Sequence, residues 1–124
     1  MANEITVTMR INVANGSLRH REEPGPIQVN QSGTTAAGGS QSIPTTAAGT
    51  AVSVGSVSTL GYAYFRNVDT TNFVEIGVQV GGTFYPLMRL NAGEAAITRL
   101  SQSTTVYARA NNLAVNLQYY ILSN

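Results

Sequence analysis

Apolar and polar residues alternate one by one along several stretches of the chain, and this period of two limits the fold more than any other feature. The clearest case is residues 74–80 and 83–90, two alternating runs on either side of Gly81-Gly82. Successive side chains of a β-strand point to opposite faces, so such runs predict half-buried strands joined as a hairpin. No segment shows sustained helical spacing of apolar residues. The sequence therefore predicts an all-β protein.

Two long alternating segments lie near opposite ends of the chain. Residues 5–13 place their apolar side chains on one face and are followed by Asn15-Gly16, the favoured pair for a type I′ turn. Residues 113–122 alternate in the same way, with Tyr119 on the apolar face and Tyr120 on the opposite one. We expect both segments in the core sheets, side by side if the chain closes as a Greek key or jelly roll.

Shorter strands and turns are expected between these two ends. About nine short strands with regular turn signals are typical of an antiparallel β-sandwich, here expected to be jelly-roll-like. The length of 124 residues suits one domain over residues 1–124. The further expected strands are 17–21, 27–29, 52–57 with Gly55 as a bulge, 60–67, 95–100 with Ile97 as apolar anchor, and 105–110; the expected turns are 69–72, 91–94, 101–103 and the two-residue hairpin loop Asn111-Asn112.

Residues 31–50 interrupt this pattern. They are mostly Gly, Ser, Thr, Ala and Gln, with almost no large apolar side chain. Two interpretations stay open: a flexible surface loop, or an assembly arm that becomes ordered against a neighbouring subunit. A long structureless loop inside a compact domain is uncommon, which keeps the arm under consideration.

The chain is poor in charge. Asp, Glu, Lys and Arg make up 10 % of the residues, against about 25 % in typical domains. All seven basic residues are Arg, and the net charge is +1. Such a surface is either polar and neutral, as in many secreted β proteins, or covered by partners in a large assembly. The charge balance gives no support for nucleic-acid binding, and the absence of Cys excludes disulfides and thiolate chemistry.

Membrane and secretion signals are not found in the sequence. No run approaches the roughly 18 to 20 apolar residues of a membrane helix, and the N-terminal segment lacks the basic and apolar regions of a signal peptide. We therefore expect synthesis and folding in the cytoplasm and no membrane partner.

The sequence offers no convincing catalytic or metal-binding set. His20, the single histidine, lies among the charged residues 19–23, a setting typical of a solvated loop rather than of a pH switch, a zinc ligand or a catalytic base. Glu75 and Glu94 are the only acids after residue 70, and nothing brings them together as a glycosidase pair. We predict that the chain is not an enzyme and uses no catalytic residue, metal or cofactor.

Aromatic and basic residues are the better candidates for a functional surface. Aromatic side chains contribute much of the energy of cores and of subunit interfaces, and on a β-sandwich they can also stack on sugar rings. Arg side chains can pair with an acidic neighbour. We favour a protein interface and keep sugar binding as the alternative. The candidate interface residues are Arg10, Arg19, Arg21, Tyr62, Tyr64 and Tyr120.

Several motifs together resemble small structural proteins of tailed bacteriophages. The resemblance covers the N-terminal strand and nearly everything from residue 60 on. The motifs are MANEITV at 1–7, Asn15-Gly16, NVDTTNFVEIG at 67–77, GTFYPLMRL at 82–90, AGE at 92–94 and LQYYIL at 117–122.

This resemblance implies a non-enzymatic virion protein of the capsid decoration (cement) type. Such a protein binds and stabilises the shell of the major capsid protein, is located on the capsid surface, and is commonly a homotrimer at local three-fold positions. In this hypothesis Arg10, Arg19 and Arg21 pair with acidic residues of the shell. The alternatives are a tail, baseplate or head-fibre component and, from another class, a carbohydrate-binding β-sandwich module with a glycan as partner.

Overall fold

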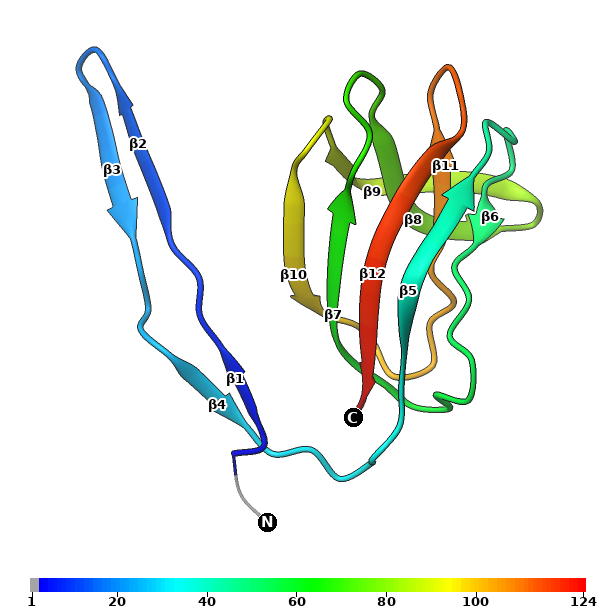
Figure 1. Ribbon diagram of the computed structural model, residues 1–124. Helices are drawn as coiled ribbons and strands as arrows, with labels where there is room; N and C mark the ends of the chain where they lie inside the picture. Colours follow the sequence, from blue (N-terminus) through cyan, green and yellow to red (C-terminus); the bar gives the residue numbers. More distant parts are fainter. Residues whose placement is uncertain (1–2) are drawn as a thin grey trace. The chain divides into compact units, whose positions relative to one another are not determined.

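The chain consists of β-strands arranged in two compact units (Figure 1). The computed structural model describes residues 3–124, so Met1 and Ala2 of the MANEITV motif lie outside the described residues. The first unit ends at Ser32 and the second is Gly33–Asn124, whereas the sequence predicted one domain over 1–124. The all-β class is confirmed. Over the described residues no helix is long and apolar enough to cross a membrane.

The first unit is a two-stranded antiparallel ribbon. β1 (Ile5–Val7) pairs with β4 (Ile27–Val29), and β2 (Ile11–Asn15) pairs with β3 (Leu18–Glu22). Residues 5–13 therefore form parts of two short strands in this ribbon, and the prediction of one long strand in a core sheet is wrong.

The tip of this ribbon is a two-residue turn made by Gly16 and Ser17. Asn15 pairs with Leu18 across the turn, and Gly16 has a φ of 57°. Glycine at the first loop position with positive φ is the type II′ arrangement. The predicted turn is present, but it is shifted by one residue from the expected type I′ turn at Asn15-Gly16.

The ribbon buries little apolar surface. Val7 is 5 % exposed, whereas Ile11 is 66 % exposed and Leu18 is 59 % exposed. A two-stranded hairpin by itself is marginally stable in water, because it has too few contacts to offset the entropy of ordering its residues. Because its large apolar side chains are mostly uncovered, the ribbon gains little stability from burial.

The second unit is an antiparallel β-sandwich, as predicted. Its first sheet has the strand order β10-β7-β12-β5, and its second sheet has the order β6-β11-β8-β9. The jelly-roll-like path stays a prediction, with which this strand order agrees. The strands are β5 (Ala36–Ile43), β6 (Thr50–Ala51), β7 (Leu60–Asn67), β8 (Val74–Val80), β9 (Thr83–Leu90), β10 (Ala95–Arg99), β11 (Tyr107–Ala110) and β12 (Val115–Ser123).

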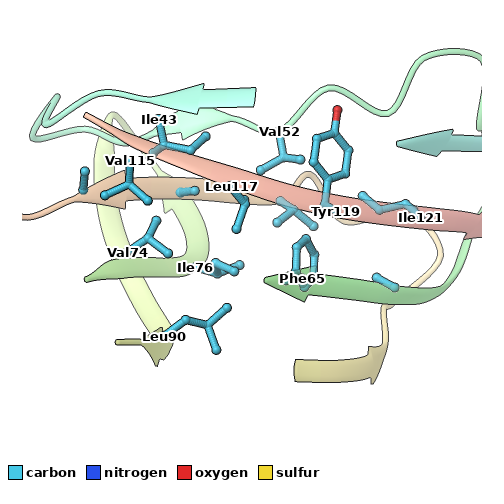
Figure 2. Close-up of a cluster of buried hydrophobic side chains, with 14 of the residues drawn as sticks. Ile43, Val52, Phe65, Val74, Ile76, Leu90, Val115, Leu117, Tyr119 and Ile121 are labelled. Atoms are coloured by element: carbon cyan, nitrogen blue, oxygen red, sulfur yellow. The ribbon is translucent and has the colours of Figure 1, made fainter. Parts of the chain in front are cut away.

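The core lies between these two sheets and follows the alternation of the sequence (Figure 2). Phe65 on β7 and Leu117 on β12 are fully buried and belong to the same core cluster as Val74 from the second sheet. Tyr119 also points inward, and its hydroxyl donates a hydrogen bond of 2.7 Å to the carbonyl of Ser53 at the edge of the core. The predicted inward face is confirmed for residues 115–121, where each apolar position is buried. It is wrong for Leu113, which lies before the start of β12 and is 68 % exposed.

A core-sheet strand lies inside the segment predicted to be a loop or arm at 31–50. β5 pairs with β12 along its whole length, from Ala36 opposite Leu122 to Ile43 opposite Val115. The flexible loop and the assembly arm are therefore both wrong for Ala36–Ile43. These residues give almost no hydrophobic signal of their own, and the strand forms because β12 supplies a partner and Ile43 is fully buried.

Three other predictions of strands, turns and core residues are wrong, because strand pairing and burial depend on residues far away in the sequence. Residues 52–57 form a turn rather than a strand, with the N–H of Val57 donating to the carbonyl of Val54 over 3.0 Å. Asn111-Asn112 does not close a hairpin, because β11 and β12 belong to different sheets. Ile97 points outward and is 45 % exposed, so it is not a core anchor. The predicted hairpin around Gly81-Gly82 is confirmed, since β8 pairs with β9.

The turn after β7 is organised by Asn67 and Asp69, and confirms the predicted turn at 69–72. Asp69 Oδ2 accepts hydrogen bonds from the backbone N–H groups of Asn72 (2.6 Å) and Thr71 (2.9 Å). These bonds, that from Asn72 first, favour the ionised carboxylate and hold the pKa of Asp69 below the ordinary aspartate value. Asn67 Oδ1 in turn accepts from the N–H of Asp69 over 2.9 Å.

The Asp69→Asn variant is expected to differ from the wild type in a pH-dependent way. Because the folded pKa is below the unfolded one, the stability from the Asp69 charge is fully present above the unfolded pKa, about 4. It is lost as the pH falls through the folded pKa. The variant should therefore be less stable than the wild type at pH 7, with a smaller gap in acid. Urea unfolding at several pH values measures this gap; an equal gap at every pH would contradict the assigned role.

Candidate interaction face

The three tyrosines predicted as interface residues lie on one surface, the outer face of the first sheet. Tyr62 and Tyr64 are neighbours on the outer side of β7, and Tyr120 on β12 is the direct cross-strand partner of Tyr64. Tyr120 is 53 % exposed, and the other two are half-buried. We call this surface the aromatic face and define it by Tyr62, Tyr64, Arg66, Ile97, Arg99, Gln118 and Tyr120.

A continuous row of residues crosses all four strands of this sheet. Ile97 pairs with Tyr64, Tyr64 with Tyr120, and Tyr120 with Gly38. A Cβ atom at Gly38 would lie 2.4 Å from Cδ1 of Tyr120, so the glycine is what allows the Tyr120 ring to lie close over β5. Cross-strand neighbours at this spacing pack against one another, and the row forms one connected apolar strip.

The aromatic face has basic residues but no acidic one. None of β5, β7, β10 and β12 contains Asp or Glu, whereas Arg66 and Arg99 point outward and are exposed. The guanidinium carbon of Arg99 lies 5.3 Å from the centroid of the Tyr62 ring, a cation–π contact, and the same group contacts the side chain of Asn124. Tyrosine and arginine without carboxylates is the composition found at the centres of protein interfaces.

A shallow hollow of about 340 Å³ lies on this face. Tyr64 and Tyr120 supply ring surface, and Gln118 supplies an amide that can both donate and accept hydrogen bonds. The hollow therefore offers stacking and hydrogen bonding, but no group for chemistry.

The acids considered for catalysis are held in separate structural contacts. Glu75 is opposite Arg109 on the neighbouring strand, and their side chains form an ion pair at 2.9 Å. Glu94 accepts a 2.7 Å hydrogen bond from the N–H of Asn91 and so closes the turn between β9 and β10. His20 Nε2 lies 2.7 Å from Glu22 on the exposed ribbon. Within residues 3–124 no group of three or more His, Cys, Asp or Glu residues is placed to hold a metal ion.

The three arginines predicted as interface residues belong to the first unit and are exposed. Arg19 and Arg21 lie on the same face of β3, opposite Ala14 and Asn12 of β2. Arg21 already forms an ion pair with Glu23 at 2.7 Å, so its guanidinium is less available to an acidic partner. The candidate residues therefore divide into tyrosines on the second unit and arginines on the ribbon.

Four residues of the aromatic face were not predicted from the sequence. Arg66 has the same strand parity as Tyr62 and Tyr64, and Gln118 has the same parity as Tyr120, so the alternation contained this signal. Ile97 and Arg99 join the face only because β10 pairs with β7, which is a tertiary choice.

Comparisons of the chain with protein-family models, with curated proteins and with solved structures gave no match. The function is therefore inferred from the geometry of the aromatic face and the ribbon, together with the resemblance described above.

Proposed function

We propose that this chain is a non-enzymatic structural protein of a tailed-phage virion, which decorates the capsid by binding the major capsid protein. The observation that carries the proposal is the aromatic face, with three tyrosines and two arginines but no acidic residue on its strands. Desolvated tyrosine and arginine side chains commonly dominate the energy of protein association. A decoration protein that binds only the assembled shell stabilises it by mass action.

The ribbon supplies a second contact in this proposal. Its exposed apolar residues, Met9, Ile11 and Leu18, are 40 %, 66 % and 59 % exposed, and burying them against the shell would stabilise the ribbon in return. Arg10, Arg19 and Arg21 would pair with acidic groups of the shell. Because Arg21 already contacts Glu23, we expect its contribution to be smaller than that of Arg19.

Truncation of Tyr64 or Tyr120 to Ala is expected to weaken binding to undecorated, expanded phage heads by about 30-fold or more, corresponding to about 2 kcal/mol for an interface hot spot. The matched control is Tyr85→Ala, since Tyr85 is 51 % exposed on β9 of the second sheet. Co-sedimentation of the purified chain with heads measures the affinity, and the Arg19→Ala/Arg21→Ala double variant tests the ribbon in the same assay.

Two results would contradict the capsid role, and a third would contradict only the proposed contact surface. Binding to purified tails but not to heads would favour a tail, baseplate or head-fibre component. Binding to neither particle would remove the virion role as proposed. Equal binding by the Tyr64, Tyr120 and Tyr85 variants would leave a virion role but remove the aromatic face as its contact surface.

A carbohydrate-binding module is the second candidate, and the hollow beside Gln118 is the observation that favours it. An exposed tyrosine ring next to an amide is suited to the apolar face and the hydroxyl groups of a sugar. Saturable binding of the isolated chain to a glycan array, lost in Tyr120→Ala and kept in Tyr85→Ala, would support this candidate instead.

A further inference from the structure

The strand β5 is an unprotected sheet edge. It is the outermost strand of the first sheet, with β12 as its sheet neighbour, and its sequence AAGGSQSI contains neither a charged residue nor a proline. The other three edge strands of the sandwich each have a protective feature: β6 is 2 residues long, β9 contains Pro86 and an irregular register opposite Ile76 and Gly77, and β10 carries Arg99. Soluble proteins normally protect exposed edges in these ways.

The open side of β5 is accessible to another strand. Ala36, Gly38, Ser40 and Ser42 point outward, and all are exposed. The segment around Ser53 is held at the inner side instead, where the Gln41 side chain bonds the carbonyl of Ala51 and the N–H of Ser53, each over 3.0 Å. Among the described residues, no backbone hydrogen bond joins that segment to β5. The free N–H and C=O groups of β5 can therefore accept a strand from outside.

A second copy of this chain fits the β5 edge. A strand that pairs with itself around a two-fold axis runs antiparallel and must tolerate its own side chains at close range. β5 meets this condition because it carries no charge and its outward side chains are small. Tyr120 adds to the fit, since its ring lies close over Gly38, beside the open edge.

We propose that β5 pairs with β5 of a second copy, so that two four-stranded sheets join into one continuous sheet around a two-fold axis. The two aromatic faces then lie on the same side of the joined sheet, and the two Tyr120 rings approach the axis. The resulting oligomer is a dimer, whereas the phage resemblance implies a trimer. The inference does not depend on the capsid role, because it concerns only the contact between two copies.

The test is a charge exchange at Ser40, an outward position of β5. Gly39 is left unchanged, because its φ of 124° is a conformation that other residues rarely adopt. The wild type is expected to be a dimer in analytical ultracentrifugation. Ser40→Lys alone and Ser40→Glu alone should each weaken the dimer at least about tenfold, because like charges then face each other. An equimolar mixture should form the heterodimer, detected by native mass spectrometry.

Ser103→Lys is the control, since Ser103 is exposed in the loop before β11 and its variant should remain a dimer. If a Ser40 variant does not fold, as judged by circular dichroism, the same exchange at Ser42 replaces it. A wild type that is monomeric or trimeric would overturn the proposal. The proposal would also be overturned if both Ser40 variants were weakened dimers but their mixture stayed monomeric. In that case β5 would not be facing β5 of the second copy.

Discussion

Replacing Asn67 by Asp is expected to lower the free energy of unfolding of the second unit by about 3–5 kcal/mol at pH 7. Asn67 is fully buried at the end of β7. Its Nδ2 donates to the carbonyl of Asn72 over 2.8 Å and to that of Leu90 over 3.0 Å. Aspartate has the same shape, but in its ionised form it cannot donate. The carbonyls of Asn72 and Leu90 would lose this donor, and a charge would be buried beside them.

Asn67 has this large effect because it joins chain segments that are distant in sequence. Its side chain connects the turn at 69–72 to the last residue of β9. Its backbone N–H donates to Glu94, and its carbonyl accepts from Gly93, in the turn between β9 and β10. Side-chain and backbone hydrogen bonds of this one buried residue thus fix two turns relative to β7.

The pH dependence of the Asn67→Asp variant gives an independent check. Burial against carbonyl oxygens should raise the folded pKa of the new carboxyl above its unfolded value. The stability from its protonated form, which can donate one hydrogen bond, is then fully present below the unfolded pKa and lost as the pH rises through the folded one. The deficit relative to wild type should therefore shrink between pH 7 and about pH 4.5.

Urea unfolding followed by circular dichroism measures the effect. The matched control is Asn116→Asp, because Asn116 is exposed on β12 and its variant should stay within about 0.5 kcal/mol of wild type. An Asn67→Asp variant within 1 kcal/mol of wild type, on the order of the net worth of one ordinary hydrogen bond, would show that these hydrogen bonds do not hold the turns.

The Gly77→Ala variant should be the second strongly destabilised one, by about 2–4 kcal/mol. Gly77 lies on β8 at an irregularity of the pairing with β9, opposite Pro86. A Cβ atom there would lie 2.0 Å from the carbonyl oxygen of Tyr85 and 2.9 Å from Cα of Pro86. Both obstacles are backbone atoms, so no side-chain rotation relieves the contact and the two strands must separate.

Thermal unfolding is a suitable readout for Gly77→Ala. In a unit of this size 1 kcal/mol corresponds to roughly 4–8 °C, so the melting temperature should fall by about 8 °C or more. Val80→Ala is the control in the same strand, since Val80 is 65 % exposed and its truncation should have little effect. Equal melting temperatures for the two variants would mean that the strands accommodate a methyl group at residue 77.

Much of the strand content of the second unit could be predicted from the sequence. The bounds of 60–67, 74–80 and 83–90 agree with β7, β8 and β9. The same alternation correctly placed Tyr119 inside and Tyr120 outside. This succeeds because side-chain direction in a strand is a local property, set by parity and independent of the partner strand.

The candidate site could be predicted only in part. Parity assigned Tyr62 and Tyr64 to one face of their strand and Tyr120 to the outward face of another. That Tyr64 and Tyr120 are direct neighbours depends on the register of β7 with β12. The arginines were placed with the tyrosines as one candidate set, but the structure locates Arg10, Arg19 and Arg21 in the separate ribbon.

The sequence by itself determined the all-β class, most strand positions in residues 60–123, and the core-facing side of β12. The tertiary structure alone decided that Ala36–Ile43 is a strand, that residues 5–13 belong to a ribbon, and that Asn67 is buried. The physical reason is the range of the interactions. Alternation is set within a strand, whereas pairing and burial depend on residues far away in the chain, as when β12 orders β5 through bonds between segments about 80 residues apart.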